Sequence, residues 1–175
     1  NTLFLSVSDD VKLYESYQKL IEVAKLNKYG VLLYVPFENV GLSLEKDITL
    51  WLKDFDPDWK TNFNINNNDL SILTSLLLQK NWKGNLTVKV AMDNIGMSGQ
   101  EDIELLNGLV RFPVQSKIES YMPKIELDLL VGNRTDLNIL PLTGEEGIED
   151  MIRIVGLTRT SAIFCLDSQN ENALV

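Results

Sequence analysis

Residues 136–166 decide the fold: they read Asp136-Leu-Asn-Ile-Leu-Pro-Leu142, Thr-Gly-Glu-Glu-Gly147, a helical segment, and Ser161-Ala-Ile-Phe-Cys-Leu166. The two apolar runs are typical of strands. Between them, apolar residues recur at helical spacing, at Ile148, Met151, Ile152 and Val155. A strand, a helix and a second strand in this order favour two parallel strands joined by a helical crossover.

The rest of the chain repeats this alternation. Further strands are expected over residues 2–7, 31–37, 86–92 and 117–122, and further helices over residues 13–24, 44–55, 69–82, 103–110 and 123–130. The pattern predicts an α/β fold with three layers, α/β/α, and a mostly parallel sheet covered by helices on both faces. The strand at 31–37 should be covered on both faces, and the strand at 86–92 should lie near a sheet edge.

We expect residues 1–175 to form a single α/β domain, with the Asn-rich loop at 62–68 as the only candidate seam between subdomains. Asp69 is a plausible N-cap for the helix that follows it. That helix is apolar nearly all round and should be deeply buried. The tail, Asp167 to Val175, is polar and should be exposed or loosely packed.

The composition is that of a folded, soluble protein, with 45% hydrophobic and 23% charged residues. The chain has no histidine, which excludes Ser-His-Asp and Cys-His catalysis and HExxH metal sites. The net charge of −9 disfavours nucleic acid and anionic membranes as partners. Asn1 follows no signal peptide, and we expect it to be a boundary within a longer protein.

Two glycine loops are weak candidates for cofactor binding. Gly96, Ser98 and Gly99 lie between a predicted strand and helix, where backbone amides can hold phosphate. Gly144 and Gly147 follow the strand at 136–142, where α/β sheets present ligands. Acidic residues in or directly after both loops would repel an anion. A plain turn and an acidic capping loop are therefore the main interpretations, and we expect no cofactor.

Other candidate sites are weaker. Asp54, Asp56 and Asp58 have the spacing of a calcium loop, but Trp59 and Ile65 stand where that loop needs Gly and Glu. We expect no metal. Cys165 lies in an apolar run without a neighbouring histidine or cation, so it is interpreted as a core residue. We predict no catalytic residues and therefore no enzyme.

Several stretches, in order, resemble the cytosolic C-terminal domain of prokaryotic cation–chloride cotransporters, within the amino-acid/polyamine/cation permease superfamily. They are Asn1-Thr-Leu-Phe-Leu, Tyr29-Gly-Val-Leu-Leu-Tyr-Val-Pro36, Asn68-Asp-Leu-Ser through Lys80-Asn-Trp82, Asp136-Leu-Asn-Ile-Leu-Pro-Leu142 and Thr160-Ser-Ala-Ile-Phe-Cys-Leu-Asp-Ser168. The resemblance implies a fold like that of universal stress proteins, placed after about a dozen membrane helices. It also implies dimerisation and regulation of transport without catalysis.

The leading hypothesis is a non-catalytic regulatory and dimerisation domain of a membrane secondary transporter, a cation–chloride cotransporter or related amino-acid permease. It would lie on the cytoplasmic face of the cell membrane, contact its own transmembrane part and form a homodimer. The dimer surface would be the exposed side of the strand around Thr87 and Lys89, or the predicted helix at 44–55. The alternative is a universal-stress-like sensor of nucleotides or other small molecules at the glycine loops. The chain lacks the Gly-rich phosphate loop of nucleotide-binding stress proteins, which argues against ATP.

Overall fold

The computed structural model describes residues 1–38, 46–55, 59–62, 64–92, 97–123 and 126–174. Within them the strands are β1 (Thr2–Ser6), β2 (Gly30–Val35), β3 (Asp47–Leu52), β4 (Asn85–Ala91), β5 (Lys117–Tyr121), β6 (Leu137–Leu142) and β7 (Ser161–Leu166). The helices are α1 (Tyr14–Leu26), α2 (Trp59–Asn62), α3 (Asp69–Trp82), α4 (Met97–Val110), α5 (Glu126–Gly132) and α6 (Ile148–Thr158), with short 3-10 turns η1 (Val11–Leu13) and η2 (Asn66–Asn68).

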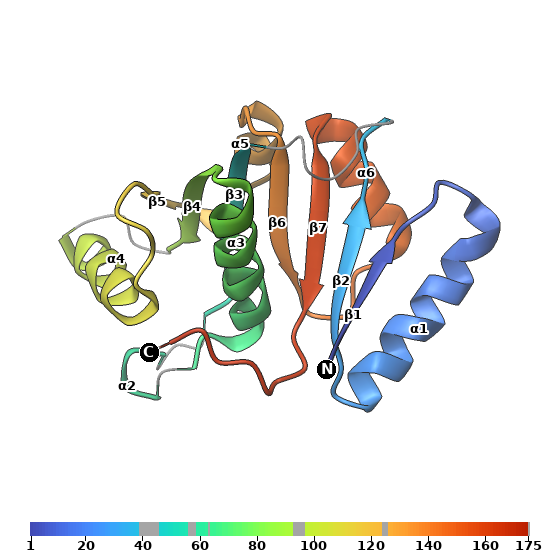
Figure 1. Cartoon of the computed structure of the whole chain (residues 1–175), viewed down its shortest axis with the longest axis horizontal. Helices are drawn as coiled ribbons and strands as arrows, with labels where there is room; N and C mark the ends of the chain where they lie inside the picture. Colours follow the sequence, from blue (N-terminus) through green and yellow to red (C-terminus); the bar gives the residue numbers. More distant parts are fainter. Residues whose placement is uncertain (39–45, 56–58, 63, 93–96, 124–125, 175) are drawn as a thin grey trace.

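These strands form one sheet in the order β1-β2-β7-β6-β3-β4-β5 (Figure 1). The five strands from β7 to β5 are parallel to one another, and β1 is parallel to β2. The two blocks meet antiparallel, where β2 pairs with β7 from Val31↔Leu166 to Val35↔Ala162. The predicted α/β fold with a mostly parallel sheet is therefore confirmed, and the antiparallel junction is an addition to it.

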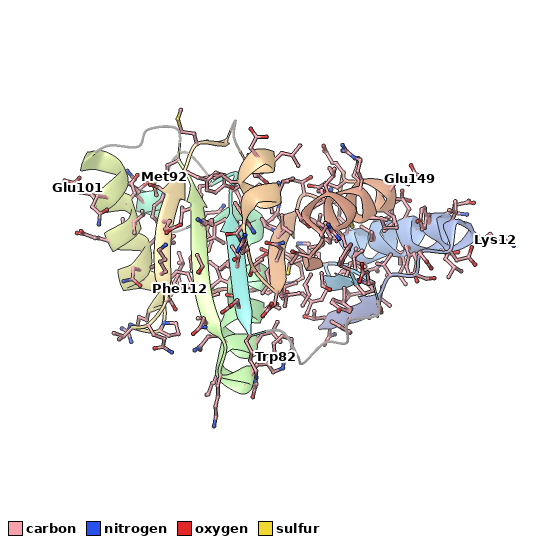
Figure 2. The ribbon with its side chains drawn as sticks, turned by 90° about the horizontal axis from the view of Figure 1, so that it is seen from above. Lys12, Trp82, Met92, Glu101, Phe112 and Glu149 are labelled. Carbon is pink, nitrogen blue, oxygen red and sulfur yellow. The ribbon has the colours of Figure 1, made fainter. Side chains whose placement is uncertain are left out.

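Helices cover both faces of the sheet, which gives the predicted three layers. On one face, α3 and α4 pack against a core that includes Ile72 and Leu106. On the other face, α1, α5 and α6 pack against a second core that includes Ile21, Leu130 and Met151. Trp82, at the end of α3, and Glu149, at the start of α6, mark the two sides when the molecule is seen from above (Figure 2).

The predicted helix at 44–55 is wrong, because residues 47–52 of this segment form the strand β3 in the interior of the sheet. Residues 44–45 lie outside the described part of the chain. Ile48 and Leu50 of β3 face one core, while Trp51 of the same strand faces the other. A strand buried on both faces reads as a continuous apolar run, and periodicity alone does not distinguish such a run from a buried helix.

The prediction of an exposed or loosely packed tail is wrong for part of that segment, although residues 169, 170 and 172 are exposed as expected. Asp167 and Ser168 are buried, and Ala173 belongs to the core beneath α3. The tail is held by a hydrogen bond to α3, in which the Ala173 amide donates to the Asp69 side chain at Oδ1 over 2.6 Å. The C-terminal segment therefore passes under the start of α3, as Figure 1 shows.

Helix α3 is less deeply buried than its sequence predicts. Its sheet-facing side carries small polar residues, with Ser71 and Ser75 fully buried. Its outward side exposes Leu73 by 38% and Leu77 by 60%. Small side chains let the helix approach the sheet closely, and the leucines are left facing outward.

Candidate functional site

The candidate site lies at the carboxyl ends of β3 and β6. The chain runs from β3 outward to β4 and β5, then returns to β6 on the other side of β3. In open α/β sheets, this change of direction opens a crevice where ligands bind. A cavity of about 220 Å³ lies at this point, lined by Lys53, Asp54, Asn66, Asn67, Pro141, Leu142 and Thr143.

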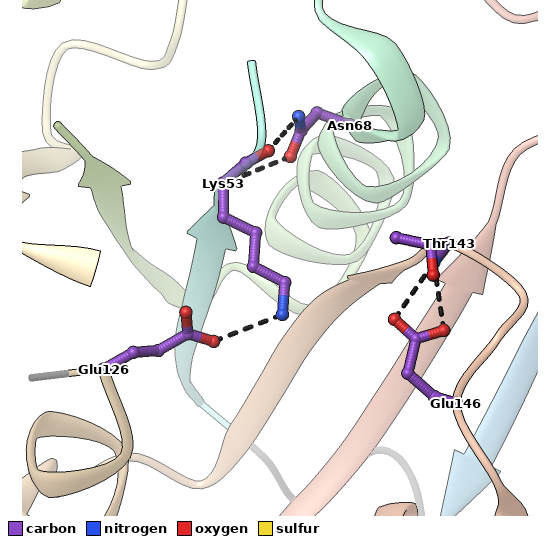
Figure 3. Close-up of polar contacts among 5 residues, drawn as sticks. All are labelled: Lys53, Asn68, Glu126, Thr143 and Glu146. Carbon is purple, nitrogen blue, oxygen red and sulfur yellow. Dashed lines mark hydrogen bonds and ion pairs between the residues drawn. The ribbon is translucent and has the colours of Figure 1, made fainter. Parts of the chain in front are cut away.

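Lys53, directly after β3, lines this crevice, and both its ammonium group and its backbone are bound within the chain. Its Nζ lies 3.4 Å from Glu126 Oε1 on α5 (Figure 3). Its backbone is held by the Asn68 side chain, which accepts from the Lys53 amide at 3.2 Å and donates to the Lys53 carbonyl at 2.8 Å. Asn68 thus ties the end of β3 to the start of α3.

The loop after β6 is closed by its own acidic residue. Glu146 accepts from the backbone amide of Thr143 at 3.1 Å (Figure 3). It also accepts from the amides of Gly144 at 3.0 Å and Glu145 at 3.2 Å. Gly144 has φ of +83°, a conformation that favours glycine. Burial opposes the Glu146 charge, but the backbone hydrogen bonds outweigh it and leave the pKa of this carboxyl below its usual value.

A third polar group lies at the end of β7, beside the same edge. Asp167 accepts from the amides of Asp69 at 3.1 Å and Leu70 at 2.7 Å, so it caps α3. Burial raises the pKa of Asp167 to about 7, and the charges of Asp69 and Glu171 add to this effect. The carboxylate serves the helix terminus rather than facing open solvent.

The glycine candidates have different outcomes. Gly96 lies outside the described residues. Ser98 and Gly99 are in the first turn of α4, which begins at Met97, so the prediction that residues 96–99 form a turn is wrong for these two positions. Gly144 and Gly147 flank the loop filled by Glu146, and Gly147 is the N-cap of α6. The two loops follow β4 and β6, which β3 separates.

The remaining candidates are Cys165 and the aspartates with calcium-loop spacing. Cys165 is fully buried, and burial raises its pKa to about 12, so the thiol keeps its proton at neutral pH. Asp56 and Asp58 lie outside the described residues. Within the described ranges, no three carboxylate or cysteine side chains are grouped to hold a metal ion.

Two features of the site were not predicted. Glu146 was interpreted as a charge that repels ligands, whereas it is itself bound by the loop amides. Asp167 was assigned to a loose tail. A local signal exists for the Glu146 contact: a glycine with positive φ, Gly144, followed two residues later by Glu. No local signal exists for the role of Asp167, since it caps a helix that starts 98 residues earlier.

Comparison with known families decides the identity of the chain. Residues 44–174 match the family described as "Prokaryotic cation-chloride cotransporter, C-terminal domain, 2nd". The chain belongs to this family. The match begins at the strand β3 and ends in the buried tail, so it includes the whole candidate site.

Solved structures agree with this cotransporter-domain fold. The cytoplasmic domain of a prokaryotic cation chloride cotransporter superposes with a TM-score of 0.80 at 24% identity, covering 99% of this chain and 66% of that one. A universal stress protein from Archaeoglobus fulgidus DSM 4304 gives a TM-score of 0.55 at 15% identity, covering 97% and 62%. The chain thus spans about two thirds of each solved chain. No protein of curated function matches the sequence.

Proposed function

We propose that the chain is a non-catalytic regulatory and dimerisation domain on the cytoplasmic face of a cation–chloride cotransporter or a related amino-acid permease. The family membership supports the link to a transporter, and the similar solved structure is of a cytoplasmic domain. The described residues contain no helix long and apolar enough to cross a membrane. Lys53 at the crevice and Glu146 beside it are both bound within the chain, which supports a structural rather than a catalytic role.

The outward face of α3 carries the dimerisation part of this proposal. Leu73 and Leu77 lie one helical turn apart and are 38% and 60% exposed. Contiguous exposed apolar side chains are favourable only when another surface covers them. Neither side chain belongs to either core, so the packing of the sheet does not depend on them.

A second copy of the chain fits this face by charge. The start of α3 carries Asp69, with Glu171 of the tail beside it. The other end carries Lys80 and the exposed Lys83. A two-fold axis across Leu77 would place two α3 helices antiparallel, so that the acidic end of each meets the basic end of the other.

The structure affects the two dimer surfaces predicted from the sequence in different ways. The helix at 44–55 is the buried strand β3, so it offers no surface. The side of β4 around Thr87 and Lys89 is half-buried, and Lys89 pairs with Glu119 on β5. Because that charge is matched within the chain, we favour the α3 face.

We further propose that residues 1–175 fold as one unit, because β2 and β7 join the N-terminal block to the rest.

The partner of this domain would be the transmembrane part of its own transporter, and the dimer contact would bias transport. The test is ion flux through the full-length transporter. Leu77→Glu should change the flux at equal membrane abundance, while Val23→Glu, an equally exposed apolar position on α1, should not. Unchanged flux in both variants would contradict regulation through α3.

Nucleotide or small-molecule sensing is the second candidate, favoured by the position of the cavity of about 220 Å³ at the carboxyl ends of β3 and β6. Titration calorimetry of the chain with ATP, AMP and cyclic dinucleotides decides it. Saturable heat that a crevice variant such as Asn67→Asp removes would support sensing. The absence of heat at millimolar ligand would end it.

A further inference from the structure

The loop Thr143–Gly147 has the form of an anion-binding loop. Successive backbone amides of Thr143, Gly144 and Glu145 all point to one carboxylate. Consecutive amides directed at one point form a concave site that favours negative charge. The loop also lies at the carboxyl end of β6, beside the crevice already described.

We infer that Glu146 is a built-in anion that occupies these amides and so closes the loop to phosphate and other external oxyanions. The contact is autoinhibitory: the chain supplies its own ligand to a loop that would otherwise accept one from solution. This inference goes beyond the proposed dimer and does not depend on it.

Geometry supports occupation by Glu146 rather than by solvent. Both carboxylate oxygens accept from the Thr143 amide at 3.1 Å, and Oε2 also accepts from the next two amides. An internal group held in place has a high effective concentration, so an external anion must displace it to bind. The lowered pKa of Glu146 keeps it charged across the neutral range.

Two lysines lie near the loop. Lys25 of α1 donates from Nζ to the Thr143 carbonyl at 3.0 Å, so the loop is also held from the neighbouring helix. Lys53 lines the crevice together with Thr143 and pairs with Glu126. The acidic groups nearby are Asp54, Glu145, Glu149 and Asp150, of which Asp150 pairs with Arg153. Removing Glu146 would therefore leave three amides without their acceptor next to a lysine.

The test is a titration of the 175-residue chain with inorganic phosphate, followed by NMR at the amides of Thr143, Gly144 and Glu145. Wild-type protein should show no saturable shift at these amides. Glu146→Ala should show one, with an affinity at least about tenfold higher than any wild-type response. Glu145→Ala is the matched control, because it removes the same charge from an exposed neighbour that accepts none of these amides, and it should behave as wild type.

The inference is overturned if folded Glu146→Ala shows no phosphate response, or if wild type binds phosphate as tightly at the same amides. Glu146→Gln covers the case in which the Ala variant does not fold. The carboxylate contributes stability above its ordinary pKa, and this is lost as pH falls through the lowered folded pKa. Glu146→Gln should therefore lose part of the acid dependence of unfolding, and an unchanged dependence would contradict the inference.

Discussion

Helices α3 and α6 pack on opposite faces of β7, yet their surfaces are arranged in opposite ways. Helix α6 buries Ile148, Met151 and Val155 and turns mainly charged residues to solvent, with one leucine, Leu157, 47% exposed near its end. Helix α3 buries serine and threonine beside Leu70 and Ile72, and turns other leucines outward. The α6 pattern is what folding alone requires of a surface helix.

The α3 pattern requires a second explanation. Its sheet side packs through Ile72 and through small residues such as Ser71. The exposed Leu73 and Leu77 lie outside this packing, so they add little to the fold of this chain. Leucine side chains that face water have an unfavourable hydration free energy unless another surface covers them. The difference between the two helices therefore separates residues that hold the domain together from the residues to which we assign the proposed dimer contact.

The largest expected effect comes from a change on the buried side of α6. Val155→Asp places a charge in a core position that is 3% exposed, and it should lower the free energy of unfolding by about 3 kcal/mol or more. Leu77→Asp on α3 should change it by about 0.5 kcal/mol or less. Chemical denaturation of both variants measures the contrast, and equal losses would refute it.

The next largest effect comes from exchanging small and large residues between the two sides of α3. Ser71→Leu adds volume on the fully buried sheet side and should cost about 1–3 kcal/mol. Leu73→Ser, the converse change on the outward side, is the control and should cost little. A tolerated Ser71→Leu would show that the helix does not sit closely against the sheet, and that its small residues have no packing role.

A smaller effect concerns the start of α3, which Asp167 caps, whereas the N-cap of α6 makes no side-chain hydrogen bond. The folded pKa of Asp167 is raised to about 7, so the folded state binds a proton more tightly than the unfolded state. The contribution of this group to stability is full at acidic pH and is lost as pH rises from about 4 to about 7.

Asp167→Asn should flatten this part of the pH profile, because the amide does not titrate. Asp69, whose pKa burial also raises, and Glu171 face the same group and will retain some dependence. Thermal unfolding between acidic and neutral pH measures the slope in both proteins. A slope as steep in Asp167→Asn as in wild type would assign the pH dependence to other groups.

Sequence patterns predicted the fold class and most elements because the βαβ periodicity is local. The strand Ser161–Leu166 was predicted with its observed bounds. The strand β3 was missed because a short run buried on both faces has no distinguishing period. The sheet junction at β2 and β7, and the cap from Asp167, depend on pairing between distant segments, which local patterns do not contain.

The candidate site was predicted less well, for a related reason. Gly144 and Gly147 were placed correctly in a loop at the end of a strand, since glycine marks turns. What fills that loop depends on the direction of the Glu146 side chain. Composition gave its charge but not its partners, and the observed hydrogen bonds change its interpretation from a repelling group to an internal ligand.

Sedimentation of the chain over a range of concentrations tests the central claim most directly. Wild type and Val23→Glu should form a dimer, while Leu77→Glu should be a folded monomer, since positions 23 and 77 are 57% and 60% exposed and differ in the helix that carries them. A monomeric wild type at all concentrations, or a dimer that persists in Leu77→Glu, would contradict the assignment of the α3 face to dimerisation.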